Sequence, residues 1–319
     1  MPENTRPTPR PGQEHFVAGP DVVKLQVIDS VDTSEAPSSM WRDAWNEMRR
    51  RPMFWVSAVM IVVVVVVSII PGVFTTTLPR VGCDLGNAFA SPSAEHLFGT
   101  NQNGCDIYAR TLFGARASVL VGTLTTAFVV IIGTAVGAIA GYYGGWIDTI
   151  LSRITDIFFA VPFVLAAIVI LSLAQERTAL TVAVVLAAFG WTSIARIARG
   201  SVLSVKNNEF VTAAKALGMG RFAIMVRHAL PNAAAPIIVY ATVALGTFIV
   251  AEATLTFLGI GLDPSTVSWG GDLSTGRGAI RSNPEIMFYP AAALGFTVLG
   301  FILLGDVVRD ALDPKARKR

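Results

Sequence analysis

Residues 117–147 read ASVLVGTLTTAFVVIIGTAVGAIAGYYGGWI, a run of 31 residues without a charged side chain. Five shorter uncharged runs accompany it, at residues 53–70, 157–175, 178–195, 229–251 and 286–305. A helix needs about 20 apolar residues to cross a hydrocarbon core about 30 Å thick, so each run is long enough for one span. The sequence therefore predicts an all-α polytopic membrane protein with six transmembrane helices, and the longest run holds one tilted span with a Gly-rich exit.

The composition supports this class and excludes others. Of the 319 residues, 53% are hydrophobic and 15% are charged, against about 25% charged in soluble domains. A soluble enzyme, a nucleic-acid binder or a disordered scaffold could not keep so much apolar surface from water. The β-branched run at residues 62–67 would suit a strand, but an open sheet edge cannot lie in lipid. A closed β-barrel is excluded because the apolar runs lack alternation with period two.

The basic residues predict the orientation in the membrane. With the N-terminus in the cytoplasm, the inside segments hold 19 of the 25 Lys and Arg residues, as the positive-inside rule requires. Both termini are then cytoplasmic. We expect a disordered cytoplasmic tail at residues 1–39, an interfacial amphipathic helix at 40–52, and a six-span transmembrane domain at 53–319. The alternative for the short helix is a soluble helix that binds a partner. The long loops are residues 71–116 outside and 196–232 inside.

The inside loop carries the most specific pattern. Residues 204–220 read SVKNNEFVTAAKALGMG. We expect a helix at 209–217 that ends at Gly218, because glycine readily takes the left-handed conformation that closes a helix. A second helix follows at 221–230, and Pro231 starts the next span, where its missing N–H does little harm. Ala213 and Ala214 have almost no side chain, so another protein surface could approach them closely.

This loop resembles the EAA loop of bacterial ABC-importer permeases. Thr212 stands where the first Glu of Glu-Ala-Ala would be, and His228 follows Gly218 at the spacing of that motif. A generic helix-turn-helix is the alternative. The resemblance implies that residues 209–218 form a coupling helix, which sits in a groove of an ATPase subunit. The residues expected to couple to the ATPase are Glu209, Ala213, Ala214, Gly218, Arg227, Leu230 and Pro231.

The resemblance covers most of the chain from residue 41 to 314. Residues 96–118 resemble the family's pattern H-x-x-G-T-D…G-R-D…R…G-A-R-x-S, with Asn101 in place of Asp and Cys105 in place of Arg. These two departures remove any charge pairing that the family makes there. Residues 305–314 resemble the family's C-terminal signature. The subunit type is the C-type permease of dipeptide and oligopeptide importers, a subfamily that also contains nickel and other small-solute members.

The resemblance implies a type I ABC importer permease fold in the bacterial plasma membrane. Such a subunit forms half of a heterodimeric pathway with a second permease, with two cytoplasmic ABC ATPases below and an extracytoplasmic peptide-binding protein above. No GxxxxGK[ST] loop occurs in the chain, so ATP and Mg²⁺ would be bound by the ATPases. The chain itself would need no cofactor or metal and would have no catalytic residues. The alternatives are a nickel or other small-solute permease, a secondary carrier subunit and an intramembrane enzyme.

One ionisable residue lies within a long apolar stretch. Glu252 has two interpretations: a carboxylate at a gate or subunit interface, or a carboxylate near the outer headgroups. Its isolation argues against a proton-coupled carrier, which usually has several acids or histidines in its spans. Asp148 and Asp156 flank the inner boundary and could pair with Arg153.

Cys83 and Cys105 are the only cysteines in the chain, and both fall in the loop that the charge count places outside. Because that side is oxidising, we expect a disulfide between them. Two free thiols are the alternative. A metal site is less favoured, because His96 is the one nearby imidazole and the set would be incomplete.

Overall fold

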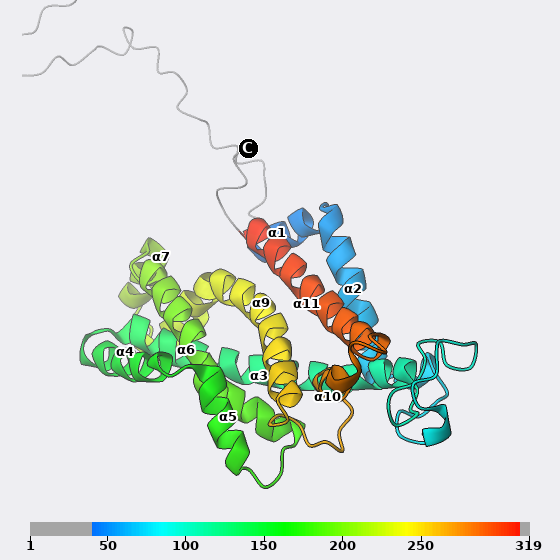
Figure 1. Cartoon of the computed structure of the whole chain (residues 1–319). Coiled ribbons are helices and arrows are strands. Elements are labelled where there is room, and N and C mark those ends of the chain that lie inside the picture. Colours follow the sequence, from blue (N-terminus) through cyan, green and yellow to red (C-terminus); the bar gives the residue numbers. More distant parts are fainter. Residues whose placement is uncertain (1–39, 313–319) are drawn as a thin grey trace, which may run out of the picture. The chain divides into compact units, whose positions relative to one another are not determined.

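The computed structural model describes residues 40–312, which form helices joined by loops and contain no strand (Figure 1). The tail predicted at residues 1–39 lies outside this part. Five helical segments are long and apolar enough to cross a membrane, namely α2 (Pro52–Ile69), α3 (Ile107–Tyr143), α6 (Ala179–Val205), Arg221–Phe257 and α11 (Glu285–Leu312). The shorter helices are α1 (Met40–Met48), α4 (Gly145–Ala160), α5 (Phe163–Leu173), α7 (Glu209–Ala216) and α10 (Trp269–Gly276).

The third predicted span is broken. In place of a straight helix over residues 157–175, α4 and α5 meet at a bend of 76°, and the pair counts as a sixth span only if taken together. Pro162 explains the break: it has no N–H, and it disfavours helical geometry at the preceding Val161, whose ψ is 120°. The run stays apolar through residues 161 and 162, although the helix is interrupted there. Hydropathy therefore did not reveal the break.

Helix α3 begins ten residues before the apolar run that predicted it. Asp106 caps it, since its carboxylate accepts a hydrogen bond from the N–H of Ala109 at 2.7 Å. The loop predicted at 71–116 therefore ends at residue 106, and the charged Arg110 and Arg116 lie on the first turns of a 37-residue helix.

The helix predicted at 221–230 and the following span are one continuous helix. α8 (Arg221–Ile224) passes through a π-helical turn, Met225–Ala229, into α9 (Leu230–Phe257). Pro231 thus does not start a new helix. In the π turn the N–H of Leu230 bonds to the carbonyl of Met225, and this wider turn accommodates the proline within the helix.

Glycines bring α3 and α6 into close contact. Gly133, Gly137 and Gly141 recur every four residues on one face of α3. A Cβ atom on Gly137 would lie 2.3 Å from the carbonyl oxygen of Ala195, and Cβ atoms on the other two would lie 2.7–2.8 Å from carbonyl oxygens of α6. Small residues at this spacing allow two membrane helices to approach backbone to backbone. The pair forms the centre against which α9 and α5 pack.

The segment between α2 and α3 is held by a disulfide between Cys83 and Cys105, as predicted, with a Cα–Cα distance of 4.3 Å. The two positions that depart from the family pattern are both explained. Asn101 Oδ1 accepts hydrogen bonds from the backbone N–H groups of Asn103 and Cys105 at 2.9 and 3.0 Å. An amide oxygen is sufficient for this role. Cys105, which stands where the family pattern has Arg, forms the disulfide with Cys83.

We expect mass spectrometry of non-reduced, alkylated protein from cells to show a cross-linked peptide that contains Cys83 and Cys105. The bridge closes a loop of 22 residues, which stabilises the fold by about 3 kcal/mol in the chain-entropy model. Cys83→Ser should therefore lower the thermal stability of the chain. Recovery of both cysteines as alkylated thiols would show that the bridge is not formed.

Candidate functional site

Helix α7 ends in a Schellman motif. Gly218 has φ +81°, its N–H bonds to the carbonyl of Lys215 at 3.0 Å, and the N–H of Met219 bonds to the carbonyl of Ala214 at 3.2 Å. A side chain at residue 218 would meet no atom within 4 Å, so only the backbone conformation demands glycine. A β-branched residue there would cost about 1–2 kcal/mol. The helix predicted from the sequence and its end at Gly218 are thus confirmed.

Of the adjacent alanines Ala213 and Ala214 of α7, one is exposed and the other is buried. Ala214 and Val211 are buried, in a cluster with Ala138 and Tyr142 of α3 and Ile224 of α8. The interpretation of Ala214 as a residue open to a partner therefore does not fit, because this face seats α7 on the chain itself. Ala213 is exposed, as are Glu209, Thr212, Lys215 and Ala216.

Large apolar side chains on the same loop point away from the chain. Leu217 is 84% exposed, Phe222 is 66% exposed and Phe210 is 39% exposed. We call these three residues the apolar loop surface. Sequence reasoning missed it: the three-residue spacing from residues 211 and 214 would place residue 217 close to the buried face, and only the structure shows that Leu217, at the end of the helix, is exposed.

The residues that follow α7 divide in the same way. Arg227 and Pro231 are exposed, whereas Leu230 is half-buried and packs against the cluster beneath α7. The side-chain amide of Asn232 donates to the carbonyl of His228 at 2.7 Å, on the turn where the π segment and Pro231 meet. The predicted coupling residues therefore form one continuous unit of helix, turn and helix, and not a set of converging side chains.

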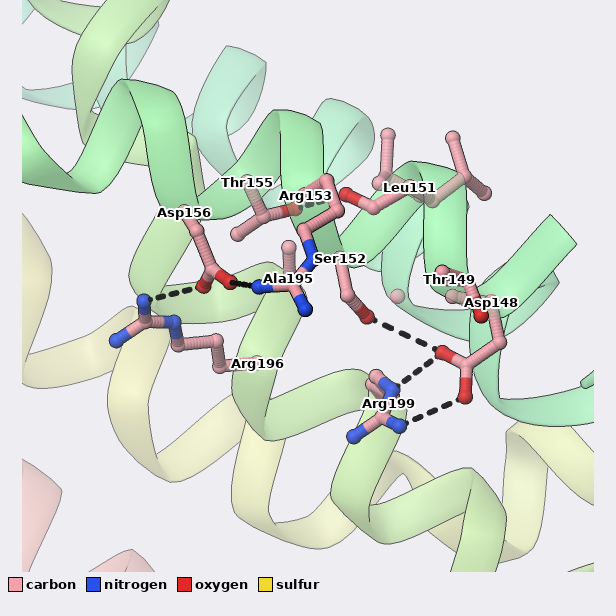
Figure 2. Close-up of a pocket in the computed structure, with 13 residues that line it drawn as sticks. Asp148, Thr149, Leu151, Ser152, Arg153, Thr155, Asp156, Ala195, Arg196 and Arg199 are labelled. Carbon is pink, nitrogen blue, oxygen red and sulfur yellow. Dashed lines mark hydrogen bonds and ion pairs between the residues drawn. The ribbon is translucent and has the colours of Figure 1, made fainter. Parts of the chain in front are cut away.

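A charged cluster ties α4 to α6 (Figure 2). The Arg199 guanidinium donates to both oxygens of Asp148, at 2.5 and 2.7 Å. Asp156 pairs with Arg196 at 2.8 Å and with Arg153 at 3.9 Å. The predicted pairing with Arg153 holds for Asp156, while Asp148 pairs with Arg199 of α6.

The cluster lines a cavity of about 560 Å³ between α3, α4 and α6. It uses the polar face of α4, while the opposite face exposes Trp146, Ile150 and Ile157. Such a helix suits the boundary between lipid and water. Within residues 40–312, no group of three or more His, Cys, Asp or Glu side chains could hold a metal ion. The arrangement is that of ion pairs which join helices.

Glu252 lies inside the chain. Its side chain is 0% exposed within this chain, so a position on a contact surface for a second subunit does not fit. The interpretations as a gate carboxylate and as a carboxylate at the level of the outer headgroups stay predictions. The hydroxyl of Thr256 donates to Glu252 Oε1 at 2.8 Å and accepts from the N–H of Leu262 at 3.0 Å. Ser118 of α3 lies beside the carboxyl group. Glu252 thereby anchors the turn after α9 against the core.

A second anchor joins α10 to the start of α3. Arg110 donates to Asp272 Oδ1 through Nε at 2.7 Å, and the indole of Trp269 donates to the carbonyl of Thr111 at 2.8 Å. Burial raises the pKa of the Asp272 carboxyl, and the Arg110 guanidinium opposes that shift. The connection between the last two long helices is thus fixed to the rest of the chain by a buried ion pair.

These features together define a helical membrane protein with a helix-turn-helix loop that leaves apolar side chains exposed. The chain belongs to the family described as the binding-protein-dependent transport system inner membrane component, which matches residues 133–318. Residues 39–87 match the N-terminal transmembrane domain of oligopeptide transport permease C. A permease of this family is a membrane component of ABC importers and not an enzyme.

Several characterised permeases are similar over most of their length. The dipeptide transport system permease of Alkalihalophilus pseudofirmus is 39% identical, and the alignment covers 88% of this chain and 91% of that protein. The oligopeptide transport system permease of Bacillus subtilis is 36% identical, over 91% of this chain and 94% of that protein. The glutathione transport system permease of Escherichia coli is also 36% identical, over 87% and 91%.

One solved structure supports the fold. The MetNI methionine ABC transporter in an inward-facing conformation aligns with a TM-score of 0.50 at 21% identity, over 63% of this chain and 94% of the matched chain. The predicted type I permease architecture is therefore confirmed for the core of the chain.

Proposed function

We propose that this chain is the permease subunit of an ATP-driven importer of peptides. It supplies half of the translocation pathway and passes the motion of a cytoplasmic ATPase to its spans through α7. The relatives with named substrates support a peptide cargo, since they transport dipeptides, oligopeptides and glutathione. The partners are a second permease, two ABC ATPase subunits and an extracytoplasmic peptide-binding protein.

The apolar loop surface is the observation that carries this proposal. Exposed Leu217, Phe222 and Phe210 lie on a rigid unit that is capped by Gly218 and seated on α3. Exposed apolar patches mark contacts with protein or with membrane, and we assign this one to a protein because it lies on the loop that we propose to be cytoplasmic. The seating matters as much as the patch, because a force on α7 reaches the end of α3 through packed side chains and reaches α9 through a continuous helix.

The chemistry of ATP hydrolysis belongs to the ATPase subunits in this proposal. The sequence contains no phosphate-binding loop, and the chain needs no metal or cofactor of its own. Mg²⁺ and ATP act at the ATPase pair, whose closure moves the two permeases between inward-open and outward-open states.

The test is reconstitution of the complete complex in liposomes. The four membrane and ATPase subunits should co-purify, and the peptide-loaded binding protein should stimulate both ATP hydrolysis and uptake of labelled dipeptide. The matched control omits this chain alone. Uptake without this chain, or no uptake of any di- or oligopeptide with it, would contradict the proposal.

For the orientation, we propose that both termini and α7 are cytoplasmic and that the disulfide and α10 face outward. Asn207→Cys and Gly278→Cys test this, because both positions are exposed and lie on opposite sides in the proposed topology. In intact cells a membrane-impermeant thiol reagent should label residue 278 and leave residue 207 unlabelled until the membrane is broken. Labelling of residue 207 in intact cells would reverse the orientation.

A further inference from the structure

A pocket of about 210 Å³ lies at the break between α4 and α5, with α6 and α9 as its other walls. The contributing residues of α6 are 189–193 and those of α9 are 240–248, near the middle of each helix. The pocket therefore lies near the Arg196 end of the uncharged run 178–195 and at the middle of the uncharged run 229–251. It adjoins the charged cluster between α4 and α6, because the Arg196 guanidinium lies 3.8 Å from the ring centroid of Phe159, which lines the pocket.

Six of the thirteen residues that line the pocket are aromatic. Phe163 of α5 meets Phe248 of α9 edge-on at a centroid distance of 6.5 Å, and Phe158 of α4 meets Phe189 of α6 at 5.8 Å. Gly190 completes the fit, because a Cβ atom there would lie 2.8 Å from the Phe248 ring. The wall is thus suited to an apolar or aromatic group.

The polar groups of the pocket are hydroxyls, and none of its lining residues is charged. Thr192 donates to the carbonyl of Phe189 at 3.4 Å, and Thr247 donates to the carbonyl of Val243 at 3.3 Å. Both hydroxyl oxygens therefore keep lone pairs that can accept from a peptide N–H. Ser193 and Tyr240 add two further hydroxyl groups.

The broken helix gives a reason for a cavity here. Irregular backbone at membrane depth is tolerated where it is covered by protein or borders a water-filled path, and transport sites are commonly built at such breaks. Val161 and Pro162, at the break, are exposed. Both residues also line the pocket, so a passing solute could reach it at the break.

We propose that this pocket receives one apolar or aromatic side chain of the peptide in transit, and thereby contributes to the side-chain preference of the importer. This inference rests on the proposed function. A complete small-molecule site usually measures about 300–1,000 Å³, so the pocket holds one side chain and not a whole peptide. The rest of the peptide then faces the second permease.

Two substitutions change the pocket in opposite directions. Ser193→Trp fills it and Phe189→Ala enlarges it. The matched control is Val169→Trp, which places the same bulk on α5 at a position that is 61% exposed and does not line the pocket. The measurement is competitive uptake of Ala-Phe against Ala-Ala by the complete importer, with chain levels matched and the binding protein unchanged.

The filled pocket should lower the uptake ratio of Ala-Phe to Ala-Ala by about tenfold or more, as expected when an apolar pocket rejects a larger group. The enlarged pocket of Phe189→Ala should raise the uptake ratio of Ala-Trp to Ala-Ala. The control Val169→Trp should give the same ratios as the wild type. Unchanged ratios in both pocket variants would overturn the proposal. Equal loss of every peptide in the pocket variants would also overturn it and would assign the pocket to lipid or to assembly. If the wild-type complex imported no peptide, the proposed function itself would fail.

Discussion

Leu217→Glu should abolish peptide uptake while the chain remains in the membrane at its normal level. Leu217 is 84% exposed, so the substitution removes almost no contact within the chain and the fold should tolerate it. In the proposed complex the same side chain is buried against the ATPase. Losing a buried leucine costs about 1.5–3 kcal/mol, and every 1.4 kcal/mol is about tenfold in affinity. A carboxylate in that apolar contact adds a desolvation cost.

Two further variants separate coupling from folding. Leu217→Met keeps an apolar side chain of similar volume and should retain uptake. Ala214→Trp changes the buried side of α7 that packs on α3, and should lower the level of the chain because it displaces α7 from α3. The measurements are uptake of labelled dipeptide, membrane level of the chain, and co-purification with the ATPases. Normal uptake by Leu217→Glu would remove the coupling role of the apolar loop surface.

The spans were predictable from the sequence where the length of an uncharged apolar run decides them. Long uncharged runs must be helices in lipid because their backbone has no other partner, and this predicted α2, α3, α6, α9 and α11. The bend at Pro162 was not predicted, although the effect of proline on the preceding Val161 was available in the sequence. Hydropathy is a sum over side chains and contains no information on whether the backbone is continuous.

The parts of the site that depend on local rules were also predicted. Gly218 closes α7, because glycine is the residue that most often ends a helix in the left-handed conformation. Cys83 pairs with Cys105, because two cysteines allow only one pairing within the chain. Which face of α7 is buried was not predictable, because the answer depends on the place of α3 beneath it. The same holds for Glu252: its burial follows from the packing of α3 and α9, which distant segments of the sequence supply.

The contact between α3 and α6 requires glycine at three positions of α3, but the sequence alone does not show that requirement. Gly133, Gly137 and Gly141 lie in a run that contains many other small residues, so the sequence does not single them out. Only the structure shows that these three face carbonyl oxygens of α6. We therefore expect Gly137→Val to be among the most damaging single substitutions in the spans.

A Cβ atom on residue 137 would lie 2.3 Å from the backbone oxygen of Ala195, so the axes of α3 and α6 must separate. Overpacking of this kind costs about 1–3 kcal/mol and occasionally more, and here it weakens the contact on which the charged cluster and the seat of α7 depend. Gly295→Val in α11 is the matched control, because a side chain there meets no atom within 4 Å.

Thermal stability and monodispersity of the detergent-extracted chain should fall for Gly137→Val and remain normal for Gly295→Val. Ala198→Gly should not rescue the first variant, although Ala198 is also within 2.8 Å of the added atom. The nearest contact is with a backbone oxygen, which no side-chain substitution can remove. A stable, monodisperse Gly137→Val chain would mean that α3 and α6 are not in backbone contact at this point.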